Sequence, residues 1–301
     1  MWRLPNWRRN KQPFTMLLKI SHRTRYHYSQ PVFLEPFTVR LRPRTDVNQT
    51  LRSYAVNIIP EPAGTSHCIG LDGNIFDTVW FGGLHDNLLI EVESVVETHH
   101  VDPFNFLITD PAALSLPLKY QPNEELALTP YLKRGSDSPE VRAFAQEIMD
   151  ATRNETVSFL TRLAQQIPTR LKYMLREHGD SWTAEETLRH GNGACRDFSV
   201  LFIEACRCAG IAARFVSGYC TGDVASDNHM HAWAEVYLPG AGWRGFDPSR
   251  GVTTSDDHVV VATSHDPQDA SPTFGHFRGH GKSTMQAEIL VTVQENDPVT
   301  T

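Results

Sequence analysis

The chain has 301 residues, of which 40% are hydrophobic and 21% are charged, an ordinary composition for a globular protein. This length can bury a sizeable core and favours two domains. A net charge of −7 and a pI of about 6.0 argue against general nucleic-acid binding. No stretch approaches the roughly 18–20 apolar residues of a membrane span, so we expect no membrane partner.

Residues 1–15 carry four basic side chains, Arg3, Arg8, Arg9 and Lys11, but lack the apolar stretch of a secretory signal. We expect a disordered arm here. The five cysteines are an odd number in a chain of this length, which argues against a disulfide framework; they lie at positions 68, 195, 206, 208 and 220. The sequence therefore predicts a cytoplasmic protein with reduced thiols. It does not indicate an oligomeric state.

Residues 16–100 show the two-residue period of β-strands. From Leu18 to Tyr28, alternate residues share one face, and later runs repeat this pattern. Asp72-Gly73 is typical of a hairpin turn. We expect an antiparallel β domain of five or six short strands with no helix and no catalytic group, which shapes one wall of a substrate cleft.

Residues 101–136 contain five prolines, and we expect an irregular connection over the surface. Helices dominate after it, in a domain that spans 137–297. Ser138-Pro139-Glu140 is a helix start, and Thr183 with Glu186 is a capping box for a short helix that ends near Gly191. Strands follow a further helix; we expect them near 211–221, 229–238, 242–247, 257–263 and 285–294. The fold class is therefore α+β, with helices packed on an antiparallel sheet.

Two glycines lead directly into Cys195, in the stretch Gly191-Asn192-Gly193-Ala194-Cys195. Apolar residues then recur at three- and four-residue steps until Gly210, which predicts a helix that begins at this cysteine. The free backbone N–H groups and the positive dipole end of a helix N-terminus favour a thiolate. Cys195 is therefore a candidate nucleophile, although a buried structural cysteine is an equally ordinary interpretation.

His231 begins an alternating stretch 36 residues after Cys195, and Asp247 follows 16 residues later. Pro239-Gly240-Ala241-Gly242 lies between the two runs and predicts a hairpin turn. Neighbouring antiparallel strands can then place His231 beside Asp247. The order is nucleophile, base and orienting acid, as cysteine-based acyl transfer requires.

Three stretches, GNGACRDFS, RCAGIAARFVSGYC and HAWAEVYLPGAGWRGFDPS, resemble the catalytic core of the bacterial transglutaminase-like proteins, which are broadly described as cysteine proteases. The resemblance covers about residues 170–265, and 16–100 resembles the β-rich N-terminal domain of the same bacterial family. It implies a papain-like, transglutaminase-like core with Cys195 as nucleophile, His231 as base and Asp247 as the acid that orients it. It also implies a hydrolase that acts on peptide or amide substrates through a thioester.

Other interpretations stay open. Transfer to an amine competes with hydrolysis; acyl transfer from a thioester donor and a non-catalytic binding scaffold are further alternatives. Neither a cofactor nor a metal site is expected, because the late histidines lack metal-binding spacing and no acidic calcium loop is visible. Asp197 is a possible second acid, but it more simply stabilises the helix start. Trp182, Trp233 and Trp243 are candidate pocket residues.

Two features of the family are harder to place on this sequence. The family's oxyanion hole combines the nucleophile's own N–H with an upstream donor, for which Tyr173 or Trp182 is a candidate. Relatives often carry Gly-Arg-Asp-Tyr after the strand that corresponds to 257–262. This chain has Ser264-His265-Asp266-Pro267 there instead, which affects substrate contacts or local structure rather than the triad.

Overall fold

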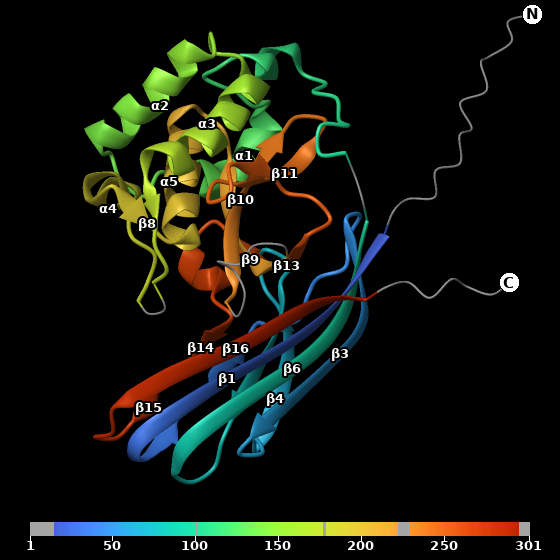
Figure 1. Ribbon diagram of the computed structural model, residues 1–301, viewed down its shortest axis with the longest axis vertical. Coiled ribbons are helices and arrows are strands. Elements are labelled where there is room, and N and C mark those ends of the chain that lie inside the picture. Colours follow the sequence, from blue (N-terminus) through green and yellow to red (C-terminus); the bar gives the residue numbers. More distant parts are fainter. Residues whose placement is uncertain (1–14, 100–101, 177–178, 222–228, 295–301) are drawn as a thin grey trace, which may run out of the picture.

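The computed structural model describes residues 15–99, 102–176, 179–221 and 229–294. The arm expected over 1–15 lies outside these ranges except for its last residue. A helical body with its own sheet stands above a β-rich body (Figure 1). The two ends of the described chain lie together in the β-rich body. None of the described helices is long and apolar enough to cross a membrane.

The β-rich body consists of two antiparallel sheets. In the larger one, β1 is central: it pairs with β6 on one side and β16 on the other, β3 extends the sheet beyond β6, and β15 pairs with the end of β1. Its strands are β1 (Thr15–Leu34), β3 (Gln49–Ile59), β6 (His85–His99), β15 (Phe277–Arg278) and β16 (Ser283–Gln294). The smaller sheet has the order β14-β2-β5-β4, with β2 (Phe37–Val39), β4 (Gly64–Ile69), β5 (Ile75–Trp80) and β14 (Thr273–Phe274). The predicted β-rich N-terminal region is confirmed.

The alternation in β1 predicts its buried face correctly. Leu18 and Ile20 are fully buried, and His22, Thr24 and Tyr28 on the same face are nearly so. A period of two sends every second side chain to one side of the sheet, so an alternating sequence buries a continuous row. β1 and β6 run for 20 and 15 residues, however, and are not short strands.

The strand expected over 285–294 forms, but its place in the core sheet was predicted wrongly. β16 pairs with β1, from Leu18 opposite Val293 to Tyr28 opposite Ser283. Ile289 is buried in the same cluster as Leu18 and Ile20. An alternating pattern predicts a strand but carries no information about which edge it joins. Strand β16 covers an edge of β1 that would otherwise present unpaired N–H and C=O groups.

The connection over 101–136 is more regular than its prolines suggest. It contains the 3₁₀ turn η1 (Pro111–Leu114) and the helix α1 (Pro122–Leu132). Pro122 occupies the first helical turn, where a missing N–H costs nothing, and Pro130 lies in the last turn. The expectation of an irregular segment was wrong because both prolines lie in end turns of the helix rather than in its middle.

The remaining helices are α2 (Pro139–Ala151), α3 (Thr156–Arg170), α4 (Ala184–His190) and α5 (Cys195–Cys208). Capping residues mark the start of α2 and both ends of α4. Ser138 Oγ accepts a hydrogen bond from Val141 N, and Thr183 and Glu186 form the predicted capping box. Gly191 ends α4 with a left-handed φ of 66°, which favours glycine. The loop into Cys195 is thus fixed by local sequence.

The second five-stranded sheet has the order β12-β11-β10-β9-β13 and is antiparallel throughout. Its strands are β9 (Ala213–Cys220), β10 (His231–Leu238), β11 (Gly242–Asp247), β12 (Val252–Thr253) and β13 (His258–Ser264). A short parallel pair, β7 (Lys172–Tyr173) and β8 (Asn192–Gly193), precedes α5, and η2 (Pro267–Ala270) follows β13. Ala232, Ala234 and Val236 belong to the same buried cluster as the apolar face of α5. This packing confirms the α+β core.

Candidate active site

Cys195 is the first residue of α5, as the glycine-led stretch predicts. Close packing requires Gly193 before it, since a Cβ there would lie 2.9 Å from Asp197 Cβ and 3.2 Å from the Phe198 ring. The peptide N–H groups of a first helical turn have no intrahelical acceptors. Cys195 as a whole residue is 8% exposed. It therefore lies in a tightly shaped backbone corner at the positive end of a helix.

Asp197 holds this corner together. Its fully buried carboxylate accepts hydrogen bonds from Ala194 N and Trp182 N, both at 2.8 Å, and from Nε and Nη2 of Arg176 at 3.0 and 2.8 Å. One side chain thus links the helix start, the preceding loop and an arginine. This arrangement supports the helix-stabilising role expected for Asp197 and leaves its oxygens no direct access to a thiol.

His231 and Asp247 lie on adjacent strands and are hydrogen-bonded. Nε2 of His231 donates to Oδ2 of Asp247 at 2.7 Å. The predicted hairpin between their strands is present, with Ala234 opposite Phe246 and Leu238 opposite Gly242. Cys195 is the second side-chain partner of the imidazole, and Nδ1 is the nitrogen left for it. The structure therefore brings the three predicted residues together in the predicted order.

The surroundings of His231 favour its protonated form. Burial lowers the pKa of His231, but the hydrogen bond and charge of Asp247, with a smaller contribution from Cys195, raise it to about 10. Burial raises the pKa of Asp247, yet hydrogen bonds and charge from His231 and then His258 hold it far below the usual range. Asp247 therefore stays ionised at neutral pH and can stabilise a protonated His231.

Asp247 is also fixed from its other side. Oδ1 accepts hydrogen bonds from Ser249 N at 2.9 Å and Ser249 Oγ at 2.6 Å, which fit the Asp-Pro-Ser sequence of the turn after β11. Because both oxygens are engaged, the carboxylate plane cannot rotate away from the imidazole. The acid is thus placed by its own turn as well as by the sheet.

His258, one of the late histidines of the sequence, is a second histidine that contacts the Asp247 carboxylate. Its Nε2 lies 3.3 Å from Oδ2 of Asp247, and its Nδ1 lies 2.6 Å from Oδ1 of Asp257. Arg250 binds both Asp257 and the thiol of Cys220 through Nη1. These residues come from separate segments, so no spacing motif reveals the cluster. The only sequence signal is the Asp257-His258 pair at the start of a predicted strand.

A cavity of about 430 Å³ opens beside Cys195 and His231. Its walls come from both bodies. On one side lie Thr24 and Tyr26 of β1 with Met285, Ala287 and Ile289 of β16, and the other side includes Cys195 and His231. The expectation that the β-rich region shapes one wall agrees with this lining. Strand β16 adds to the wall, which was not expected.

The residues that line the cavity show which of the candidate pocket residues face it. Tyr173 lines the cavity, whereas Trp182, Trp233 and Trp243 are not among its lining residues. Trp182 stacks on Arg176, and Trp233 is almost fully buried against His258. The stretch that departs from the family pattern ends at Pro267, which lines the cavity with Gln268 of η2. The departure therefore changes the surface offered to a substrate.

The profile of the transglutaminase-like superfamily matches residues 142–248, and that of the bacterial transglutaminase-like N-terminal region matches residues 18–97. An uncharacterized protein of Mycobacterium bovis is 30% identical over 93% of both chains, and one of Mycobacterium leprae is 25% identical over 91% of this chain and 98% of its own. A crystal structure described as "a Putative Cysteine Protease from Cytophaga hutchinsonii" superposes with a TM-score of 0.71 at 20% identity, over 95% of this chain and 93% of that one. The chain therefore belongs to the transglutaminase-like superfamily, in the bacterial form that carries the β-rich N-terminal region.

Proposed function

We propose that the protein is a cysteine enzyme that cleaves amide or peptide bonds through a Cys195-His231-Asp247 triad and a thioester intermediate. One observation carries this proposal: the connected side chains Cys195, His231 and Asp247 lie beside a cavity of about 430 Å³. A nucleophile, a base and an orienting acid in contact are the requirements for acyl transfer from an amide.

Acylation follows from this geometry. The Cys195 thiolate attacks the carbonyl carbon, and the C=O pair moves onto oxygen to give a tetrahedral oxyanion. The N–H of Cys195, in the first turn of α5, is our candidate donor to that oxyanion. The imidazolium of His231 then protonates the leaving nitrogen as the C–N bond breaks. The products are an amine and a thioester on Cys195.

Deacylation reverses the roles. Neutral His231 takes a proton from water, the resulting hydroxide attacks the thioester carbonyl, and the carboxylic acid leaves as the thiolate and imidazolium pair re-forms. We favour hydrolysis over amine transfer because water reaches any open cavity, whereas transfer needs a second site that holds the amine and excludes water. The enzyme is then a peptidase or amidase.

Asp247 acts through orientation and charge in this scheme. Its carboxylate accepts from Nε2 and so leaves Nδ1 directed at the thiol. It also stabilises the positive charge on His231, as the acid of a serine triad does. No step requires the proton to reach Asp247.

Two rival functions have different requirements. An acyltransferase with a thioester donor would use the same triad but would need room for the donor's thiol-bearing arm. A binding scaffold would need no intact triad, and the hydrogen-bonded Cys-His-Asp set counts against it. We also propose a cytoplasmic location, supported by the five free cysteines, and a peptide or amide substrate rather than a nucleic acid or a membrane.

The test has two stages. The protein and a Cys195→Ala variant, with Cys208→Ala as a matched control on the same helix, are exposed to a limiting iodoacetamide probe. Labelling that depends on Cys195 alone supports an enzyme; equal labelling of all three proteins rejects it. A protein substrate is then incubated with a labelled primary amine, and peptide release and amine incorporation are both measured. We expect release to dominate; incorporation without release would assign a transglutaminase instead.

A further inference from the structure

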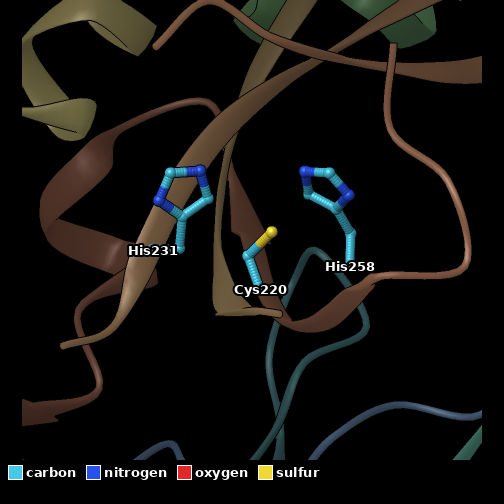
Figure 2. A group of neighbouring side chains, drawn as sticks. All are labelled: Cys220, His231 and His258. Carbon is cyan, nitrogen blue, oxygen red and sulfur yellow. The ribbon is translucent and has the colours of Figure 1, made fainter. Parts of the chain in front are cut away.

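Three buried side chains, one of them the triad residue His231, converge at one end of the core sheet. Cys220 ends β9, His231 begins β10 and His258 begins β13. The thiol of Cys220 lies between the two imidazole rings (Figure 2). One ligand atom from each residue lies within 4.8 Å of the other two.

The sheet register explains why they meet. His258 is directly opposite Cys220 across the β9–β13 pair, and His231 is opposite Gly218 across the β9–β10 pair. Residues 218 and 220 point to the same side of their strand. All three side chains therefore project from one face of the sheet.

Two of the three side chains, those of His258 and Cys220, already have the outer partner that a metal ligand needs. Asp257 binds Nδ1 of His258 at 2.6 Å, which directs Nε2 inward. Arg250 donates to the sulfur of Cys220 at 2.9 Å and so stabilises a thiolate. Metal-bound histidines usually donate their outer N–H to a carboxylate in this way, and such partners orient the ligand.

We propose that Cys220, His231 and His258 form a three-ligand binding site for a soft divalent transition metal such as Zn²⁺, with the carboxylate of Asp247 beside it. Oδ2 of Asp247 already lies 2.7 Å from Nε2 of His231 and 3.3 Å from Nε2 of His258. Thiolate, imidazole and carboxylate are the ligands that zinc prefers.

The dimensions and charges suit this ion. Zinc bonds of about 2.0–2.3 Å place tetrahedral ligand atoms about 3.3–3.6 Å apart. The cluster therefore has to contract by about 1.2–1.5 Å at its widest. The thiolate of Cys220 and the adjacent carboxylate of Asp247 together balance the two charges of the ion. Arg250 and Asp257 form an ion pair beside it, so the occupied site carries no unpaired buried charge.

Metal binding would inhibit the enzyme, a consequence that rests on the proposed function whereas binding itself does not. The ion would replace the proton on Nε2 of His231, so the ring could no longer form the imidazolium that protonates the leaving amine. It would also remove the hydrogen bond that Nε2 of His231 donates to Asp247. The site would therefore act as a reversible metal-dependent off-switch.

The experiment is a Co²⁺ titration of the full chain under mildly alkaline, thiol-free conditions, followed by Zn²⁺. Four-coordinate cobalt bound to a thiolate gives a near-ultraviolet charge-transfer band and intense visible bands. We expect both in the wild-type protein, and we expect Zn²⁺ to displace them. Cys220→Ala should remove the charge-transfer band, and Asp257→Asn should weaken binding by about 10–100-fold. Thermal unfolding confirms that each variant is folded.

The variant Cys195→Ala is the decisive control, because it is inactive under the proposed function but retains every proposed ligand. Its titration should match that of the wild type. The proposal is overturned if the wild type gives no such bands, if Cys195→Ala loses the charge-transfer band, or if folded Cys220→Ala keeps it. If Cys220→Ala does not fold, Asp257→Asn decides: unchanged affinity rejects the site. Binding in an otherwise inactive protein would refute the proposed function without affecting the metal site.

Discussion

Nε2 of His231 lies 2.7 Å from Oδ2 of Asp247, and both side chains are withdrawn from solvent. A hydrogen bond between two ionised groups is stronger where water cannot compete for them. The pair therefore has one orientation, which leaves the opposite ring nitrogen for the thiol.

The change Asp247→Asn tests this pair. It keeps the shape but removes the charge and can select the wrong imidazole tautomer. The matching change in a serine triad costs about 10⁴-fold in rate. Since a preformed thiolate–imidazolium pair depends less on the acid, we expect a loss of about 10–10³-fold. Turnover and the pH profile of Cys195 alkylation are the measurements. If neither changes, Asp247 is not the orienting acid.

Cys195 should be the cysteine that is alkylated fastest at neutral pH. It lies at a helix start beside His231 and lines the cavity, whereas Cys206 is fully buried in the core. Burial raises the pKa of the Cys206 thiol well above its ordinary value, which lowers its reactivity. Mass spectrometry after brief alkylation measures the order. Faster labelling of Cys206, Cys208 or Cys220 would contradict it.

Asp197→Ala should destabilise the protein by about 3–5 kcal/mol, because it removes the acceptor of four hydrogen bonds and leaves Arg176 unpaired. Urea unfolding measures the change in free energy. Asp137→Ala is the control, since it removes an exposed carboxylate that also pairs with arginines; because solvent screens that pair, it should cost far less stability than Asp197→Ala. Equal losses in the two variants would show that Asp197 is not a structural centre.

His258→Gln should lower stability in a pH-dependent way. Burial lowers the pKa of His258, but Asp247, Asp257 and then Cys220 raise it well above 6.5. A raised pKa contributes stability that is complete below the unfolded value of 6.5 and is lost as pH rises through the folded value. The wild type should therefore exceed the variant by about 1.5–3 kcal/mol near pH 6.

Unfolding of both proteins between about pH 6 and pH 10 checks this sign. The difference in unfolding free energy should shrink as pH rises. A difference that is constant, or that grows with pH, would mean that His258 is not held as an imidazolium between the two carboxylates.

Gly218→Ala should destabilise the core sheet by about 1–3 kcal/mol. The added Cβ would lie 2.1 Å from the carbonyl oxygen of Val259 and 2.6 Å from the ring of Trp233. Gly82→Ala is the control, because a Cβ there meets nothing within 4 Å. Thermal unfolding compares the two. If Gly218→Ala is as stable as Gly82→Ala, close packing at Gly218 is not required.

Local signals in the sequence predicted local structure well. The capping box at Thr183 and Glu186 and the turn between β10 and β11 are present as expected. These features involve residues within about ten positions of one another, so the local sequence determines their geometry. The same holds for Cys195, whose helix start and preceding glycines are contiguous.

Long-range relationships could not be predicted in the same way. The alternation of β16 fits either sheet, and only the unpaired edge of β1 decides between them. His258 and Cys220 meet because β9 and β13 pair, which no spacing in the sequence indicates. Pro130 was expected in an irregular segment but lies in the last turn of α1. The energetic penalty of a proline in a helix depends on which turn it occupies.

The pairing of β16 with β1 has a consequence for synthesis. A ribosome delivers β1 early and β16 only after about 250 further residues, so the larger sheet cannot close until almost all of the described chain has emerged. Met285, Ala287 and Ile289 are delivered in that last strand and line the cavity beside Cys195. A nascent chain would therefore hold Cys195 in an incomplete cleft until β16 has left the ribosome.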